Sequence, residues 1–404
     1  MIRFCLFLSF ISFTVLAEET RPAADANAGA RALWAEFMTR MLADYHEPVD
    51  ELDLTRKAVD LLAQNPAVAS LPKPRDYGTT PDAQRNAFQQ YVIAFALKAG
   101  RRMDANTVVE LAIQNLCERH LRFAQYIPAS VQTKLSNLGK ANLGMRIEVS
   151  ETGRFFCQPF PGEAAALAGI ESGDELIGLD GVEVAGMNRW ELKGRLYGTD
   201  GSKAEVRVRQ ATGRTITAQL TRRVTGGLRI TSSSGIGGTT IRIPIFDANT
   251  LPDLQAALKA AKPGAPLTLD LRGNGGGEIP PAVDGAALFI DGPRPLTLAL
   301  QQRRGQPDVA LTSNEAMIPG FKRLLVLMDG GTASSAELFI AILTEATNLR
   351  VALSGARSYG KDLWLDGANL KNGGGELYLP VGTLVTKGGK RWPKGIEPTF
   401  GVKK

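Results

Sequence analysis

Histidine is scarce in this 404-residue chain and occurs only at His46 and His120, both in the N-terminal third. Residues 225–404 contain no histidine. A Ser-His-Asp triad assembled within that region is therefore excluded. His120 could reach it from another domain, but a histidine at the surface or at the edge of a core is the simpler interpretation. Any serine chemistry in residues 225–404 needs a different base.

Long apolar runs are equally scarce, and only the N-terminal "MIRFCLFLSFISFTVLA" comes near to one. It combines Arg3, an apolar run from Phe4 to Leu16, and small residues at positions 15 and 17. This pattern is typical of a secretory signal peptide cleaved after Ala17, and the run is short for a transmembrane helix. We expect a periplasmic or otherwise exported protein. An uncleaved membrane anchor is the alternative.

Cysteine is rare as well. The sequence has three cysteines, and removal of residues 1–17 would leave Cys117 and Cys157. Two cysteines in an oxidising compartment could form a disulfide, but they could also be buried thiols in different domains. There is no C-x-x-C pair and no cluster of cysteine with histidine. We therefore expect neither a structural zinc ion nor another metal or cofactor.

A strong charge of one sign is also absent. The formal net charge is +6 and the isoelectric point is about 9.2, but basic and acidic residues are interspersed. The sequence has no long cationic run, no zinc-finger spacing and no aromatic-rich RNA-binding motif. Binding to nucleic acid is therefore not expected.

The patterns that are present divide the rest of the chain into three regions. Residues 18–141 are predicted to be helical, with one apolar stripe formed by Leu33, Phe37, Met41 and Leu42. Residues 142–224 combine short strands with helices. In residues 225–404 strands and helices alternate, which favours an α/β layer with a partly parallel sheet. The predicted fold class is multidomain α+β.

The stretch "LDLRGNGGGEI", residues 269–279, places three consecutive glycines between a predicted strand and a predicted helix. Glycines leave backbone N–H groups accessible, and amides that converge at such a turn can bind a phosphate or an oxyanion. A phosphate loop is not indicated, because no G-K-[ST] follows and no G-x-G-x-x-G opens a βαβ unit. A plain turn is the alternative.

The stretch "DGGTASSAEL", residues 329–338, places Ser334 and Ser335 after the predicted strand "RLLVLM". Its small residues would let a substrate backbone approach the serines. A neutral lysine can activate a serine, and burial in an apolar pocket favours the neutral form of a lysine. The stretch "SYGKDLW" supplies Lys361 directly after another predicted strand. A solvated surface lysine is the alternative for Lys361.

Taken together, these motifs resemble those of the C-terminal processing (tail-specific) serine peptidases. The stretches "LTLDLRGNGGGEIPPAVDGAALFI", "LLVLMDGGTASSAELFIAIL", "SGARSYGK" and "KGIEPTF" follow the order of that family's motifs, D-L-R-x-N-x-G-G, G-[ST]-A-S-A-S-E, F-G-K-G and K-G-I-E-P. Residues 142–224 resemble the family's PDZ domain, and "YHEPVDELDLTRKAVDLL" resembles its N-terminal helical segment more weakly. The resemblance implies a peptidase core in residues 225–404, with the layered sheets and helices of ClpP- and crotonase-like folds.

The resemblance also implies roles for individual residues. Ser334 aligns with the family's nucleophile and Lys361 with its general base. The backbone amide of Ser335 and an amide from the glycines Gly275, Gly276 and Gly277 would form the oxyanion hole. A nucleophile at a helix N-terminus has exposed amides and a favourable dipole beside it, which agrees with these roles. Ser335 is expected to contribute its backbone rather than to act as a second nucleophile.

The sequence departs from the family pattern at Leu365, where the family often has a glutamine that helps to orient the lysine. Asp362, Asp366 or backbone carbonyls could orient it instead. The spacing between Ser334 and Lys361 is also longer than usual in the family, and residues 64–105 are less familiar. The departure at Leu365 puts catalytic efficiency, and activity itself, in question.

The PDZ resemblance implies a site for the substrate. Such domains bind a C-terminal peptide as an added strand, and loop amides capture its carboxylate. The loop here would be Leu143-Gly144-Met145. Leu192 and Leu196, four residues apart on a predicted helix, could line the side-chain pocket or equally face the domain core. The N-terminal helices could serve homodimerisation or gating, and a regulatory partner is conceivable.

We therefore expect an exported, metal-independent Ser-Lys endopeptidase that acts on protein C-terminal tails. The expected boundaries are a signal peptide at 1–17, a helical domain at 18–141, a PDZ domain at 142–224 and a peptidase core at 225–404. One alternative is a non-catalytic binding or adaptor protein on the same fold, which Leu365 motivates. The other is a different hydrolase on this scaffold, such as an esterase or amidase.

Overall fold

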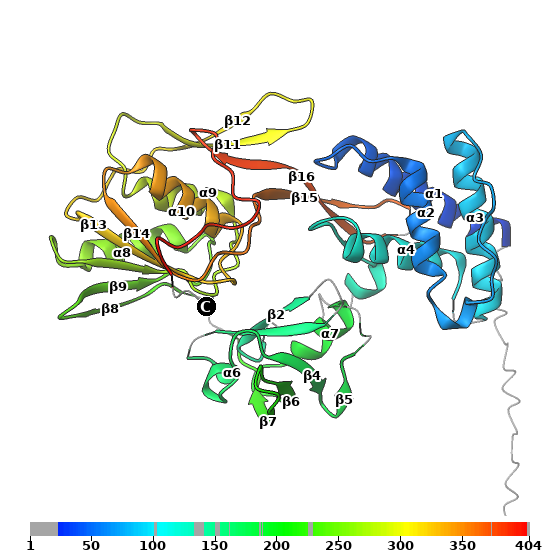
Figure 1. Ribbon diagram of the computed structural model, residues 1–404, viewed down its shortest axis with the longest axis horizontal. Helices are drawn as coiled ribbons and strands as arrows, with labels where there is room; N and C mark the ends of the chain where they lie inside the picture. The colour runs from blue at the N-terminus through cyan, green and yellow to red at the C-terminus, as the bar shows by residue number, and fades with distance from the viewer. Residues whose placement is uncertain are drawn as a thin grey trace, which may run out of the picture.

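The computed structural model describes residues 23–100, 103–132, 141–149, 154–160, 162–185, 187, 189–224, 229–372 and 374–401. The predicted signal peptide, residues 1–17, lies outside these described residues. The chain forms three lobes (Figure 1), with a helical lobe at one end, an α/β lobe at the other and a β-rich lobe below the space between them. Two long strands, β15 and β16, extend from the α/β lobe to the helical lobe.

The helical lobe contains α1 (Ala23–Asp44), α2 (Glu51–Leu62), the short 3-10 helix η1 (Pro66–Val68), α3 (Pro81–Ala99) and α4 (Ala105–Arg119). Each of the last three α-helices begins at a side-chain cap: Asp50, Thr80 and Asp104 accept the N–H group three residues ahead. The predicted stripe is confirmed at Leu33, Phe37 and Met41, which are fully buried, whereas Leu42 is 39% exposed. Leu42 follows Met41 directly, and adjacent residues on a helix point about 100° apart.

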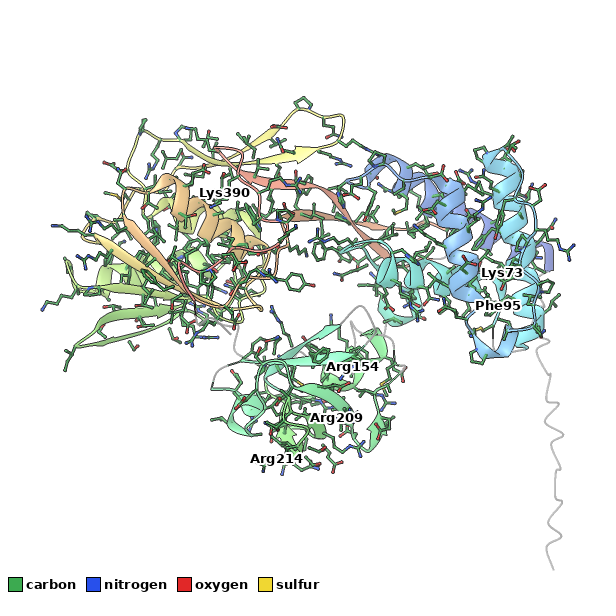
Figure 2. The ribbon with its side chains drawn as sticks, in the orientation of Figure 1. Lys73, Phe95, Arg154, Arg209, Arg214 and Lys390 are labelled. Atoms are coloured by element: carbon green, nitrogen blue, oxygen red, sulfur yellow. The ribbon has the colours of Figure 1, made fainter. Side chains whose placement is uncertain are left out.

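The core of the helical lobe is completed from the other end of the chain. β1 (Gln125–Ile127) pairs antiparallel with the start of β16 (Glu376–Thr386), which also pairs with β15 (Leu363–Asn369). Leu370, Leu377, Leu379 and Val381 pack in one cluster with the side chains of α1 to α4, where Phe95 also lies (Figure 2). The helical lobe is therefore built from residues of both the predicted helical region and the predicted peptidase core.

The β-rich lobe is an antiparallel sheet with the strand order β2-β3-β4-β6-β7. Its strands are β2 (Met145–Val149), β3 (Phe155–Pro159), β4 (Glu175–Leu179), β5 (Val182–Glu183), β6 (Lys203–Arg209) and β7 (Thr215–Thr221). The helices α6 (Ala164–Leu167) and α7 (Arg189–Leu196) belong to the same lobe. Cys157 is buried in its core, whereas Cys117 is buried in the helical lobe, and the two form no disulfide.

The α/β lobe has a six-stranded sheet with the order β17-β14-β13-β10-β9-β8, and only β8 runs antiparallel to its neighbour. The strands are β8 (Thr231–Gly235), β9 (Gly238–Arg242), β10 (Leu267–Asp270), β13 (Arg323–Met328), β14 (Arg350–Gly355) and β17 (Phe400–Gly401). The alternation of apolar strands with helices correctly predicted this mostly parallel sheet. Because β10 and β13 are parallel neighbours, the loops after them emerge at the same edge.

Three helices, α8 (Thr250–Ala260), α9 (Ile279–Ala287) and α10 (Ser335–Ala346), lie between this sheet and a second one. The second sheet has the order β1-β16-β11-β12, with β11 (Leu296–Arg303) and β12 (Val309–Ser313) forming a hairpin. Side chains from both sheets and all three helices form one apolar core. Within the described ranges, no helix is long and apolar enough to cross a membrane.

Candidate active site

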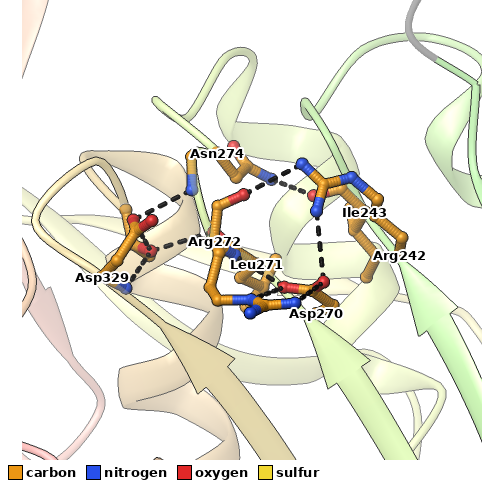
Figure 3. A network of polar contacts seen from close by, with 9 residues as sticks. Arg242, Ile243, Asp270, Leu271, Arg272, Asn274 and Asp329 are labelled. Carbon is orange, nitrogen blue, oxygen red and sulfur yellow. Dashed lines mark hydrogen bonds and ion pairs between the residues drawn. The ribbon is translucent and has the colours of Figure 1, made fainter. Parts of the chain in front are cut away.

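Two loops at the carboxyl edge of the parallel sheet form the base of the site, one after β10 and one after β13. The carboxylate Oδ1 of Asp329 accepts the N–H groups of Gly273 and Gly331, each at 2.9 Å. Thr332 Oγ1 donates to the Leu271 carbonyl at 2.9 Å. Figure 3 shows Asp329 bonded to the loop after β10, which also carries Asn274. The two loops are therefore held together by buried and partly buried hydrogen bonds.

Asp270, the last residue of β10, belongs to the same network of polar contacts (Figure 3). It accepts from Arg272 Nη2 at 2.8 Å and from Arg242 Nη1 at 3.1 Å. Burial by itself would raise the pKa of Asp270, but the hydrogen bonds from Arg272 and the two positive charges outweigh it, and the net pKa is lowered. The carboxylate is therefore charged and fixes the start of the glycine loop.

The glycine loop packs directly against Ser334. Gly276 has a φ of +101°, and a β-carbon on it would lie 2.8 Å from both the Ala333 carbonyl oxygen and Ser334 Cβ. The Gly276 N–H donates to Asn274 Oδ1 at 2.8 Å. This amide is therefore engaged, which removes it from the predicted oxyanion donors in this structure. Gly275 and Gly277 line the cavity beside Ser334.

Ser334 precedes α10 in a sharp turn with φ 60° and ψ −124°. A non-glycine residue rarely adopts a positive φ, and such strain is concentrated at functional positions. Ser335 is the first residue of α10, so its N–H has no partner within the helix. Its side chain is fully buried, and within the described part of the chain its Oγ has no hydrogen-bond partner. The geometry leaves Ser335 able to offer its amide, but not to reach solvent as a nucleophile.

Ser334 and Lys361 line the same cavity, which has a volume of about 530 Å³. Its walls come from both sheets and the glycine loop, and they include Gly275, Gly277, Glu278, Ile279, Pro280, Gln301, Leu311, Leu363, Trp364, Leu365 and Leu384. The tertiary structure thus brings together the predicted nucleophile, the predicted base and two of the glycines proposed for the oxyanion hole. Leu363, Trp364 and Leu365, which follow Lys361 closely in the chain, contribute to the same wall.

Leu365 lies in this wall, so the position of the family's glutamine is indeed at the cavity. Of the two aspartates considered as substitutes, one accepts a hydrogen bond from an arginine and the other is exposed. Asp362 is fully buried and accepts from Arg391 Nε at 2.8 Å, and Asp366 is exposed on β15. His120 is an exposed residue at the end of α4, as expected for a histidine outside the site.

Sequence reasoning missed the central role of Glu337. This carboxylate is fully buried and accepts four hydrogen bonds, from Ser358 Oγ at 2.6 Å and from the N–H groups of Gly360, Lys361 and Ser334 at 2.7, 2.8 and 2.9 Å. Burial raises the pKa of Glu337, although these donors oppose the rise. A glutamate three residues after a serine at a helix start is a capping-box signal, which could have indicated the bond to Ser334 but not the other three.

The predicted tail-binding residues of the β-rich lobe lie mainly in its core. Leu143, Met145, Leu192 and Leu196 are between 1% and 7% exposed and belong to one apolar cluster. For Leu192 and Leu196, the structure supports the alternative in which they face the domain core. The Gly144 N–H donates to Asn142 Oδ1 at 2.8 Å, so this loop amide is engaged.

The β-rich lobe touches the candidate site through Arg146 on β2. Its Nη2 donates to the Gly331 carbonyl at 2.6 Å. Its guanidinium also occupies the space that a β-carbon on Gly275 would need. One arginine therefore contacts both loops that surround Ser334.

A family model matches the part of the chain that carries the candidate site. Residues 238–402 match the model of a family described as Peptidase family S41, a serine-type peptidase family. The matched segment carries both loops, Ser334 and Lys361.

The relatives of the chain are carboxy-terminal processing proteases. It is 27% identical over 324 residues to carboxy-terminal processing protease CtpA of Bacillus subtilis (strain 168), a match that covers 78% of this chain and 68% of the relative. It is 30% identical over 264 residues to the chloroplastic C-terminal processing peptidase of Tetradesmus obliquus, covering 59% of this chain and 56% of that relative.

Among solved structures, the chain resembles the photosystem II D1 C-terminal processing protease. The TM-score is 0.62, with 93% of each chain covered and 21% sequence identity. At this identity, the likeness shows that the two chains share a fold.

Proposed function

We propose that this protein is an exported serine endopeptidase in which Ser334 and Lys361 form a catalytic dyad. The observation that carries the proposal is that both side chains line one cavity beside Gly275, although they are distant in sequence. No histidine occurs in residues 225–404, so lysine is the base that the local chemistry offers. The S41 match to residues 238–402 supports the same assignment.

In the proposed reaction, neutral Lys361 takes the proton from Ser334 Oγ, and Oγ attacks the scissile carbonyl carbon. The amides of Ser335 and Gly275 donate to the oxyanion of the tetrahedral intermediate. Collapse of this intermediate breaks the peptide bond, and the lysine ammonium gives its proton to the leaving amine. Water then hydrolyses the acyl-enzyme, with Lys361 again acting as base.

For the substrate, we propose proteins recognised through their C-terminal tails, with the β-rich lobe acting as a PDZ domain. The relatives carry the name of C-terminal processing proteases. β2 lies at the outer position in its sheet and could accept a tail as an added strand. Arg146 on β2 would then connect tail binding to the loops around Ser334.

The test is degradation of an unfolded reporter with an apolar C-terminal tail. It compares the mature protein with Ser334→Ala and Lys361→Ala variants, with EDTA as a control for contaminating metalloproteases. Loss of the nucleophile costs on the order of 10⁶ in turnover in a well-characterised serine protease, so both variants should fall to background. A wild type that binds the tail, does not cleave it and is not labelled at Ser334 by a fluorophosphonate would instead be a binding or adaptor protein.

Export and assembly are separate parts of the proposal. N-terminal sequencing of the protein isolated from its host should begin at Glu18 if residues 1–17 are a signal peptide. A first residue within 1–17 would contradict cleavage after Ala17. Dimerisation through the helical lobe stays a prediction, which sedimentation of the mature protein tests.

A further inference from the structure

The turn between α4 and β1 lies against the segment that carries Lys361, although it is far away in the sequence. Arg122 Nη2 donates to the carbonyl of Gly360 at 2.9 Å and to that of Pro393 at 3.0 Å. Gly360 is the residue immediately before Lys361. The helical lobe is thus hydrogen-bonded, through one guanidinium, to the backbone of the segment that carries Lys361.

The next residue in this turn, Phe123, faces the lysine itself. Lys361 Nζ lies 5.4 Å from the centroid of the Phe123 ring, within the range of a cation–π contact. Arg122 Cζ lies 4.7 Å from the same centroid. The ring of Tyr359 lies 6.0 Å away at an angle of 42°. The Phe123 ring is therefore the shared surface of two cationic side chains.

The backbone at Phe123 is held in an unfavourable conformation. Its φ is +63°, an outlier for a bulky aromatic residue. Such a conformation persists only where the surrounding structure enforces it. Here the Ala124 N–H donates to the Leu121 carbonyl at 3.0 Å, and both side chains are buried in the core of the helical lobe. The fold therefore presents this ring to Lys361 in spite of a local energetic cost.

We propose that Phe123 is a positioning residue for Lys361. Its ring holds the side-chain nitrogen in the cavity and stabilises the ammonium that forms when the amine takes the proton of Ser334. This inference rests on the proposed Ser-Lys chemistry.

An aromatic ring suits this task better than a charged partner. A carboxylate next to the amine would stabilise the ammonium so strongly that little neutral base would be left. A ring stabilises a cation weakly and leaves the lone pair of the neutral amine free for the serine proton. The side chains of Leu363 and Leu365, which line the same cavity as Lys361, have no polar atom that could orient the amine.

Other charged and titratable groups surround Lys361 on the elements packed against it. Glu278 lines the cavity from the glycine loop, and Glu337 binds the Lys361 N–H from α10. Arg122 of the turn contacts the carbonyl of Gly360, and Tyr359 and Asp362 lie in the same segment as Lys361. To keep these groups constant, the main comparison is between proteins that differ only at Phe123.

The test uses the full-length mature protein and its Phe123→Leu and Phe123→Tyr variants. For each, kcat/KM on an apolar-tailed peptide and the rate of fluorophosphonate labelling of Ser334 are measured across pH. Leucine keeps the apolar volume and the unusual φ but has no ring, whereas tyrosine keeps the ring. Tyr359→Leu is the matched control, because it removes an aromatic ring from the same cluster without removing the contact to the amine. Thermal unfolding shows that each variant is folded.

We expect Phe123→Leu to lower the plateau of kcat/KM by about 3- to 30-fold, the factor that corresponds to a cation–π contact. We also expect the acid limb of its pH profile to move to lower pH. The ring favours the ammonium, so its removal lets the neutral base persist at more acidic pH, even though that base has become less effective. Phe123→Tyr and Tyr359→Leu should stay within about twofold of the wild type, with the acid limb unmoved.

Two results would overturn the inference. The first is wild-type activity in Phe123→Leu. The second is a loss of activity with the acid limb unmoved, since a merely structural role lowers the plateau alone. If the wild type itself is neither labelled nor active, the proposed function is wrong, and this inference, which depends on it, is wrong as well. If the wild type is active and Ser334→Ala is not, the dyad stands, and the outcome at Phe123 decides the inference by itself.

Discussion

The carboxylate Oε2 of Glu337 accepts the backbone N–H of Lys361 at 2.8 Å. The same oxygen accepts the N–H of Ser334 at 2.9 Å, while Oε1 binds Ser358 Oγ and the Gly360 N–H. One buried side chain therefore sets the relative position of the two residues proposed to react.

Glu337→Gln should impair both stability and activity. The amide has one acceptor oxygen in place of two and directs an NH₂ group at existing donors, which should cost about 1–3 kcal/mol of unfolding free energy. A small displacement of reacting groups lowers turnover by about 10–100-fold. Thermal unfolding and peptide hydrolysis measure the two effects.

Glu345→Gln provides the matched control on the same helix. Glu345 accepts from Thr386 Oγ1 and from the Gly388 N–H, outside the cavity. It should lose stability on a similar scale but keep its turnover when assayed well below the unfolding temperature. Equal losses of turnover in the two variants would contradict a specific role for Glu337.

Gly276→Ala should abolish peptidase activity. The added β-carbon would lie 2.8 Å from the Ala333 carbonyl oxygen and from Ser334 Cβ, so the serine must move. Gly273→Ala is the control, because Gly273 also has a positive φ, +70°, but its β-carbon would meet open space. Fluorophosphonate labelling should be lost in the first variant and retained in the second. Labelling of Gly276→Ala at the wild-type rate would show that this contact does not matter.

Arg146→Ala should reduce kcat/KM by about tenfold, the effect of losing one hydrogen bond from a charged group. Arg146 is the β-rich lobe's contact to Gly331 and Gly275, and its removal loosens both loops. Arg154→Ala is the comparison, since Arg154 lies in the same lobe (Figure 2) but pairs with Glu175. Hydrolysis by both variants is measured on one tailed peptide. Equal activities of the two variants would mean that the contact of Arg146 with the two loops does not affect catalysis.

Asp270 should contribute to stability above its ordinary pKa of 3.8 and lose this contribution as the pH falls. Its pKa in the folded protein is lowered by the hydrogen bonds and charges of Arg272 and Arg242, so the unfolded chain takes up a proton first on acidification. Asp270→Asn removes this effect. Urea unfolding at pH 7 and in the range below pH 4 should show a smaller loss of stability on acidification in the variant. An identical pH dependence in both proteins would contradict this assignment.

Cys157 should be inert to thiol reagents in the folded protein. Burial, reinforced by the negative charge of Asp174, raises its pKa to about 12, so almost no thiolate is present at pH 8. Reaction with a disulfide reagent should begin only on unfolding. In denaturant, two thiols per chain indicate that Cys5 was removed with residues 1–17, and three indicate that it was retained. Rapid reaction of Cys157 in the native protein would contradict its burial.

Much of the fold could be predicted from local patterns. The apolar spacing in α1 and the alternation of strands and helices after residue 225 are properties of short stretches, so they can be recognised before any packing is known. Ser334, Lys361 and the glycine loop were predicted from the resemblance to a known family's motifs, and the structure places Ser334, Lys361 and Gly275 at one cavity.

Local sequence patterns could not predict features that depend on tertiary packing. Leu192 and Leu196 are equally compatible with a groove and a core until their neighbours are known, and the structure buries both. The glycine triplet offers several amides, and only the side chain of Asn274 determines that Gly276 is engaged. No local pattern indicated that β16 would complete the core of the helical lobe.

The sequence by itself determined the chemical components: a serine at a helix start, a lysine after a strand, flexible glycines and no nearby histidine. Only the tertiary structure decided how they are held. Glu337 acts on Ser334 and on residues 358–361 together, and Phe123 meets Lys361 across more than half of the chain. Such contacts depend on the parallel sheet and on the packing of two lobes, which involve residues far apart in sequence and leave no local periodic signal.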